Sequence, residues 1–444
     1  MRKKSNQKLK GRVPYMLGMV GGTASYIVMS NLTYALTESF GMTAKIVGMI
    51  FLISRIFDGI TDLIAGVIID RTKTKLGKAR PFEVFYIPLW IAVILCFSVP
   101  AQLGMTGKII WVFVTYNLSQ SVFYTFITCI ESVRLRRSFE ESARVKVVSV
   151  AYVGAFVAGL LVSISMPILI SIFENMAHGW SIITLIYAVP FMICGMIRLI
   201  FLKELDVEEP EITQKREKVS VLAYVKALFQ NPYAFIIAGM VLLMGVSSSL
   251  SSALNYYFKY VFGDIALASL PGLFSVLAVA ANFILPKISE KLGTKKIFML
   301  AFILYAAGGF LRYLTPASLV MFVVTQLILS NATMYVNSMK HVALTETMVY
   351  GEWKSKQNFE AIYASVSGMA DKLGMGLGSV AIGFILDLGG YDGALAVQSA
   401  SAITSIKFLN AGIHGVIGIV GFVLALLYTL EKKLPAIRGE LAEK

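Results

Sequence analysis

Long runs of apolar residues, separated by short polar connections, dominate this chain. About twelve windows reach the roughly 20 apolar residues that a helix needs to cross a bilayer. The runs show no period-two alternation, which argues against a transmembrane β-barrel. The pattern therefore predicts an all-α polytopic membrane protein, with helices near residues 13–36, 44–69, 82–101, 109–133, 147–172, 180–201, 234–262, 267–285, 297–314, 320–339, 361–386 and 412–430.

Composition and charge agree with a membrane protein. The 444 residues are 57% hydrophobic and only 15% charged. The net charge of +14 does not indicate nucleic-acid binding, because most of the 40 lysines and arginines fall in the two tails and in every second loop. By the positive-inside rule we expect an even number of spans and both termini in the cytoplasm, with a bacterial inner membrane as the default location. The 3 cysteines lie in apolar segments and have no disulfide or zinc spacing.

One charged run divides the chain into two halves. Residues 203–221 include KELDVEEPEITQKREKV, which predicts a cytoplasmic linker between six-helix bundles at 1–202 and 222–444. A basic turn containing Lys-Leu-Gly follows the second helix of each half, in DRTKTKLGKAR and in PKISEKLGTKK. Such a repeat is typical of the paired halves of secondary transporters.

The second predicted helix carries two carboxylates at bilayer depth. Asp58 and Asp62 are four residues apart and share one helix face, with Arg55 one turn earlier. A carboxylate at this depth costs roughly 2.5 to 3.5 kcal/mol, so the pair requires a reason. One interpretation is a site for Na⁺, Li⁺ or H⁺ between the two carboxylates. The other is a buried ion pair with Arg55 that helps the helices to pack.

Other polar residues of the predicted spans suggest a central cavity. The window 109–133 is rich in polar residues, including Tyr116 and Gln120, which favours a cavity lining over hydrogen bonding between helices alone. Lys372 lies mid-span, where a lysine cannot snorkel, so we expect it to face the cavity and to pair with a carboxylate.

The charged loop after the second helix predicts a cytoplasmic gate, although the positive-inside rule alone also explains its charges. The gate residues are Asp70, Arg71, Lys78 and Arg80.

The stretch SRIFDGITDLIAGVIIDRTKTKLGKARPF closely resembles the signature of the glycoside-pentoside-hexuronide cation symporters, a melibiose permease-like family of the major facilitator superfamily. NYYFKYVFGD, GEWKS and DKLGMGLGSVAIGFILDLGGY extend the similarity along most of the chain. The resemblance implies twelve helices in two pseudo-symmetric bundles, alternating access, and coupling of a solute to Na⁺, Li⁺ or H⁺.

The resemblance also assigns roles to residues. Asp58 and Asp62 match the cation-binding carboxylates of the family, which makes a Na⁺ site there the expectation. Thr23 and Thr128 fall where sugar-transporting relatives carry aspartates. The absence of these carboxylates argues against a galactoside-like substrate. It makes an anionic solute an alternative, with Lys372 or Lys259 as its countercharge. The remaining matches are Thr61 and Thr125 as further cation ligands, Arg55 and Lys372 as charge-coupling residues, and Tyr256 as a candidate at the solute site.

Three other functions were weighed against a symporter. A lipid or amphiphile transporter of the same fold fits the aromatic content, and a transport-inactive sensor would explain the missing sugar aspartates. An enzyme is not expected, because the 3 histidines lack HExxH spacing and no GxSxG or phosphate-binding loop is present. We expect no cofactor beyond the coupling ion, and as partners only a small solute and the lipid bilayer, with no nucleic acid and no obligatory protein partner.

Overall fold

The computed structural model describes residues 11–204, 228–282, 285–356 and 360–442, and it is helical throughout these ranges apart from short connections. The chain forms two compact units. The first comprises Met1–Ile212, Gly263–Ser269 and Asp392–Val397, and the second comprises Thr213–Phe262, Leu270–Tyr391 and Gln398–Lys444. Most of the predicted linker at 203–221 lies outside the described residues.

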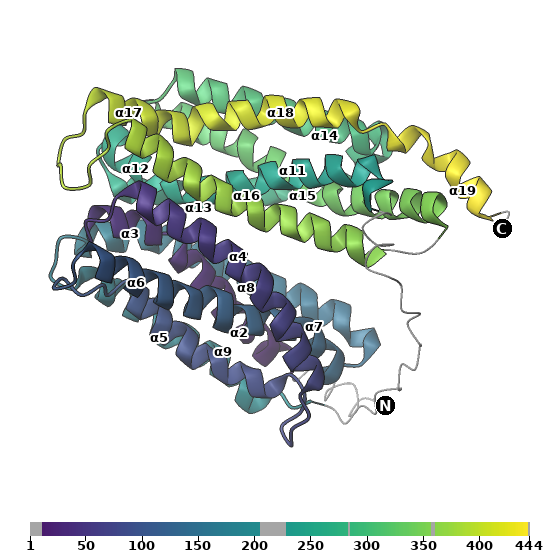
Figure 1. Cartoon of the computed structure of the whole chain (residues 1–444), viewed down its shortest axis with the longest axis horizontal. Helices are drawn as coiled ribbons and strands as arrows, with labels where there is room; N and C mark the ends of the chain where they lie inside the picture. Colours follow the sequence, from purple (N-terminus) through teal and green to yellow (C-terminus); the bar gives the residue numbers. More distant parts are fainter. Residues whose placement is uncertain (1–10, 205–227, 283–284, 357–359, 443–444) are drawn as a thin grey trace. The chain divides into compact units, whose positions relative to one another are not determined.

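The first unit carries the two carboxylates. In this unit α2 packs against α8 and α9, and α4 packs against η2 and α7 (Figure 1). Its elements are α2 (Arg12–Met29), α3 (Leu32–Glu38), α4 (Ala44–Arg71), η1 (Arg80–Phe85), α5 (Tyr86–Cys96), α6 (Met105–Tyr116), η2 (Asn117–Tyr124), α7 (Thr125–Ser138), α8 (Glu141–Phe173), α9 (Gly179–Phe201) and η5 (Ile265–Ser269).

The second unit is built from helices in the same way. Here α11 packs against α16, and α14 packs against α15 and α18. Its elements are α11 (Pro232–Leu250), η3 (Ser251–Ala253), α12 (Leu254–Tyr257), η4 (Phe258–Phe262), α13 (Leu270–Asn282), α14 (Leu285–Leu314), α15 (Leu319–Ser355), α16 (Glu360–Leu388), α17 (Ala400–Lys407), η6 (Phe408–Gly412), α18 (Ile413–Leu427), η7 (Leu430–Lys432) and α19 (Leu434–Ala442).

Within the described residues, 7 helices are long and apolar enough to cross a membrane, so the chain is a multi-pass membrane protein. Two boundaries predicted from hydropathy are wrong. The loop expected after residue 339 is helical, because α15 continues to Ser355, and the last helical rod begins at Ala400 rather than near 412. Apolar windows mark only the part of a helix that needs a lipid environment, whereas backbone hydrogen bonds continue the same helix through polar sequence.

The polar window at 109–133 forms one rod from α6 to α7 that is interrupted by a π-helical segment, η2. A π-helical turn inserts an extra residue and rotates the following side chains relative to the preceding ones. Such segments occur frequently at functional sites. In this rod η2 presents its hydroxyl and amide side chains to α4.

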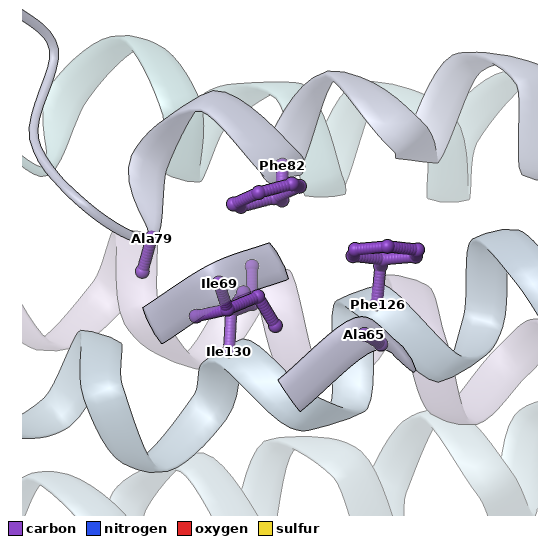
Figure 2. Close-up of a cluster of buried hydrophobic side chains, with 6 residues drawn as sticks. All are labelled: Ala65, Ile69, Ala79, Phe82, Phe126 and Ile130. Atoms are coloured by element: carbon purple, nitrogen blue, oxygen red, sulfur yellow. The ribbon is translucent and has the colours of Figure 1, made fainter. Parts of the chain in front are cut away.

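A small apolar core holds α4 against α7 next to the carboxylates. The rings of Phe82 and Phe126 stack with centroids 5.2 Å apart and planes at 17°, as Figure 2 shows. Ala65 and Ile69 of α4 are buried in the same cluster, together with Ala79 and Ile130. Ala65 follows Asp62 by one turn and Phe126 is adjacent to Thr125, so this packing sets the distance between those two polar side chains.

Candidate cation and solute site

Asp58 is buried and has two polar partners. Its Oδ2 accepts a hydrogen bond from Nη1 of Arg55 at 2.8 Å, within one turn of α4. Its Oδ1 accepts a short hydrogen bond from the hydroxyl of Ser121, on η2. The ion pair considered from the sequence is therefore present, and it is joined by a hydroxyl from a segment 63 residues away.

The hydroxyl of Ser121 belongs to a chain of polar groups between α4 and η2. Asn117 Oδ1 lies 3.0 Å from the Ser121 oxygen, and Asn117 Nδ2 donates to the Ser54 hydroxyl at 2.9 Å. The sequence analysis included this part of the helix in a polar cavity lining but assigned neither Ser121 nor Asn117 to the cation site. Their spacing of four residues on one face of the helix was the available signal.

Asp62 has a different partner. The Thr125 hydroxyl donates to Asp62 Oδ1 at 3.3 Å, so α7 supplies this contact while η2 supplies the contact to Asp58. The Thr61 hydroxyl donates to carbonyls of its own helix, at 3.0 Å to Phe57 and 3.2 Å to Asp58. Two carboxylates, the hydroxyls that contact them and one amide oxygen thus gather along adjoining faces of α4, η2 and α7.

This oxygen set suits a hard, weakly held cation. Among the described residues, no three histidine, cysteine, aspartate or glutamate side chains form a metal cluster. Carboxylate, hydroxyl and amide oxygens favour hard ions over transition metals. Arg55 occupies one oxygen of Asp58, so a cation that bound this oxygen would have to displace a guanidinium that is tethered on the same helix.

Several predicted solute-site residues lie in the same unit, and they differ in exposure. Thr128 is exposed, but its hydroxyl donates to the Tyr124 and Thr125 carbonyls at 3.1 and 2.9 Å. Thr23 is half-buried on α2. Tyr116 is buried and stacks on Phe51, at 4.7 Å between centroids. Gln120 is also buried, and its Nε2 has no hydrogen-bond partner among the described residues.

The structure adds an aromatic pair that the sequence did not single out. Tyr26 of α2 stacks on Tyr124 of η2, with centroids 6.1 Å apart and planes at 24°. Tyr26 is 37% exposed and Arg55 lies within electrostatic reach of both Tyr26 and Tyr116. A ring face beside a hydrogen-bonding cluster is the surface that a sugar ring or another partly apolar solute can stack on.

Two predicted residues belong to the second unit. Lys372 is half-buried on α16, next to Asp371 in the sequence. Tyr256 is fully buried, and its ring packs edge-on against Tyr391 with centroids 5.3 Å apart. Tyr256 therefore stabilises the packing of the second unit in this structure, and its predicted contact with a solute stays untested.

A second charged cluster lies at one end of the first unit, and the sequence analysis missed it. Glu83 is fully buried between Arg134 and Arg198, with its Oε1 at 2.7 and 2.6 Å from their Nε atoms. Arg198 also pairs with Glu131, at 2.6 Å. Both arginines are fully buried. The signal in the sequence was a set of opposite charges inside three different apolar segments, which requires pairing in the membrane.

The predicted gate loop is held by a carboxylate of its own unit. Glu204 accepts hydrogen bonds from the backbone N–H groups of Lys78, Ala79 and Arg80, at 2.9, 2.9 and 2.7 Å. The Arg80 side chain donates to the last carbonyls of α9, at 2.8 Å to Leu199 and 3.3 Å to Ile200. Arg71 is exposed, and the side chain of Asp70 lies outside the described part of the chain. Arg80 thus caps a helix end, and the gate role of this loop stays a prediction.

The Lys-Leu-Gly turns of the two halves share this construction. Gly77 and Gly293 both have positive φ, at +112° and +75°. Glu431 accepts from the Lys295 N–H at 2.9 Å, just as Glu204 accepts from the turn of the first half. At both glycines an added Cβ would collide with the capping carboxylate. The sequence repeat therefore corresponds to a repeated structure: a glycine turn capped by a glutamate that follows α9 in the first half and α18 in the second.

Gly77→Ala should destabilise the protein more than a glycine substitution that costs backbone strain alone. Gly41 has φ +66° and nothing within 4 Å of an added Cβ, so Gly41→Ala serves as the matched control. We expect Gly41→Ala to lower the free energy of unfolding by about 1 kcal/mol and Gly77→Ala by about 3 kcal/mol, because the latter also displaces Glu204. Thermal unfolding of the detergent-solubilised proteins measures both, and equal losses would contradict the capping role of Glu204.

Comparison with known proteins identifies the family of this chain. The family model for MFS/sugar transport proteins matches residues 14–432. The chain belongs to this family. Membership confirms the resemblance to the glycoside-pentoside-hexuronide cation symporters and the major facilitator fold, which we inferred from the signature in α4 and the loop after it.

Relatives of this sugar transport family cover nearly the whole chain. The isoprimeverose transporter of Lactiplantibacillus pentosus is 29% identical, over 98% of this chain and 91% of the relative. The putative glycoside/cation symporter YagG of Escherichia coli (strain K12) is 26% identical, over 98% and 95%. The crystal structure of the nucleoside transporter NupG superposes with a TM-score of 0.65 at 14% identity, covering 94% of this chain and 99% of NupG, and supports the fold.

Proposed function

We propose that this MFS/sugar transport protein is a secondary active symporter that couples uptake of a sugar, glycoside, uronide or related polar solute to Na⁺, Li⁺ or H⁺. The observation that carries the proposal is the buried Asp58, held by Arg55 and Ser121 beside the Asp62–Thr125 pair. A cation site between the two carboxylates gives a reason for placing both of them on one helix at this depth. The proposal includes twelve spans, both termini in the cytoplasm and a bacterial inner membrane.

The proposed coupling step is an exchange of charge at Asp58. The coupling ion enters between Asp58 and Asp62, and the Arg55 guanidinium leaves Asp58 Oδ2 as the ion arrives. The liberated guanidinium can then turn toward Tyr26 and Tyr116, the side on which we place the solute. Without the ion, the site holds two carboxylates and one guanidinium, and this uncompensated negative charge disfavours closure around the solute. Transport is therefore tied to ion binding.

The proposed solute contacts combine a stacking surface with neutral hydrogen-bonding groups. Tyr26 and Tyr124 offer the ring faces, while Thr23, Thr128 and Gln120 offer the polar groups. Neutral groups orient sugar hydroxyls less strongly than a carboxylate does, and they repel an acidic solute less. Isoprimeverose, which the name of the Lactiplantibacillus pentosus relative gives as its substrate, and a uronide are therefore the first solutes to test.

The experiment that tests this function is thermal unfolding of the purified protein with a panel of sugars, glycosides and uronides, each in sodium, lithium or ion-free buffer. A ligand that binds only the folded state raises the melting temperature by mass action. We expect one solute class to shift the melting temperature, and the shift to grow with the coupling ion. If no solute responds in any ionic condition, sugar symport is wrong for this chain.

Ser121→Ala and Thr125→Val should each weaken binding of the coupling ion. Each removes a hydroxyl that contacts one of the two carboxylates, a charge-assisted interaction worth roughly 1.5 to 3 kcal/mol. We expect affinity for Na⁺, measured from its effect on the melting temperature, to fall by about tenfold or more.

The matched control is Thr184→Val, because the Thr184 hydroxyl is equally buried but donates only to the Trp180 and Ser181 carbonyls of its own helix. Its Na⁺ affinity should equal that of the wild type. Unchanged affinity in both Ser121→Ala and Thr125→Val would place the ion elsewhere.

A further inference from the structure

An apolar groove lies on the first unit, away from the carboxylates. It has a volume of about 580 Å³ and is lined by Met16 and Val20 of α2, by Phe191 of α9 and by one face of α8 between Ser149 and Leu161. The volume falls within the roughly 300 to 1,000 Å³ typical of small-molecule sites. The surface that the groove exposes is apolar. The groove is thus suited to an apolar occupant.

The length of the groove matches one leaflet of a bilayer. From residue 149 to residue 161, α8 rises by about 18 Å at about 1.5 Å per residue. The hydrocarbon core is about 30 Å thick, so one leaflet takes about 15 Å of it. The membrane-crossing part of α8 runs from Lys146 to Phe173, and the groove occupies its first half. An acyl chain of a single leaflet has this length and this position.

Basic residues precede the residues that line the groove on both α2 and α8. Arg12 precedes Met16 by one turn of α2, and Lys146 precedes Val150 by one turn of α8. The Arg12 Nε is buried and has no hydrogen-bond partner in the part of the chain that the structure describes. Lys146 is exposed.

We propose that this groove binds one acyl chain of an anionic phospholipid, with the lipid phosphate held by Arg12 and Lys146. The apolar lining buries the chain, and the cationic side chains of Arg12 and Lys146 can donate the charge-assisted hydrogen bonds that a phosphate oxygen accepts. A zwitterionic lipid fits the lining equally well but gains less from two cations at this end of the helices. The groove shares no lining residue with the proposed ion and solute site, so either proposal can fail without the other.

The test titrates dioleoyl phosphatidylglycerol, or dioleoyl phosphatidylcholine, into the purified full-length protein in detergent and follows the melting temperature. We expect phosphatidylglycerol to raise it at lower concentration than phosphatidylcholine. Arg12→Gln with Lys146→Gln should weaken the apparent affinity for phosphatidylglycerol about 25-fold, about fivefold for each basic residue. Val153→Trp with Val157→Trp fills the groove at two exposed positions and should remove the shift for both lipids.

Two matched pairs serve as controls. Arg136→Gln with Lys432→Gln removes two exposed charges elsewhere, and Val189→Trp with Ile193→Trp adds two indoles to the exposed face of α9. Both should keep the wild-type response, and glycerol 3-phosphate alone should give none. Equal affinity for the two lipids, a response that survives the loss of Arg12 and Lys146, or an equal loss in the charge controls would each overturn the proposal. If the Val153→Trp, Val157→Trp protein does not fold, the Arg12→Gln, Lys146→Gln protein and its charge control still decide whether the proposal holds.

Discussion

Asp58→Asn is expected to abolish uphill accumulation of solute while leaving the protein in the membrane. The substitution keeps the size of the side chain and removes a buried charge that contacts both Arg55 and Ser121. Loss of one charge about 4 Å from a bound cation costs about 4 kcal/mol at an effective dielectric constant of 20, which lowers ion affinity about a thousandfold. Arg55, no longer paired with Asp58, then repels the cation further.

The measurement is uptake of labelled solute into membrane vesicles under an imposed ion gradient, with protein amount checked by immunoblot. Asp264→Asn is the matched control, because Asp264 is exposed and its side chain accepts a hydrogen bond from the Ala266 N–H that asparagine can also accept. The control should accumulate solute as the wild type does. Undiminished ion-driven accumulation in Asp58→Asn would remove Asp58 from the coupling mechanism, whichever ion is used.

The second large effect is expected on stability, from Glu83→Ala. Glu83 is fully buried between two fully buried arginines. Without Glu83, the nearest carboxylate to Arg134 among the described residues is that of Glu204, at 3.8 Å. Arg198 keeps its ion pair with Glu131. Breaking a buried ion pair from one side typically costs about 3 to 5 kcal/mol, because the remaining charge stays desolvated. We expect a large fall in melting temperature and reduced amounts of folded protein.

Two further variants separate the ion pair from simple truncation. Glu352→Ala removes an exposed glutamate and should change the free energy of unfolding by no more than about 0.5 kcal/mol. Glu83→Leu combined with Arg134→Met replaces both partners by apolar groups and should be more stable than the sum of the single changes predicts. A Glu83→Ala protein as stable as Glu352→Ala would show that the cluster does not hold this end of the unit together.

The sequence could predict much of the site because its key residues are close together along one helix. Arg55, Asp58 and Asp62 fall on one face of α4 by helical periodicity alone, and the ion pair between the first two is an (i, i+3) contact. The glycine turns were visible as a repeated Lys-Leu-Gly. The contacts of Ser121 and Thr125 with α4 were not, because each joins residues 63 positions apart and depends on the rotation of the π-helical segment.

The sequence by itself determined what each segment is: an apolar helix, a polar face, a basic turn or a charged linker. These properties follow from local periodicity and from the cost of placing charge in hydrocarbon. Only the tertiary structure decided which distant groups satisfy one another, as when Glu204 caps a turn 124 to 126 residues away and Glu83 pairs with arginines of two other helices. A buried charge requires a partner, but helix packing alone determines which side chain comes within reach.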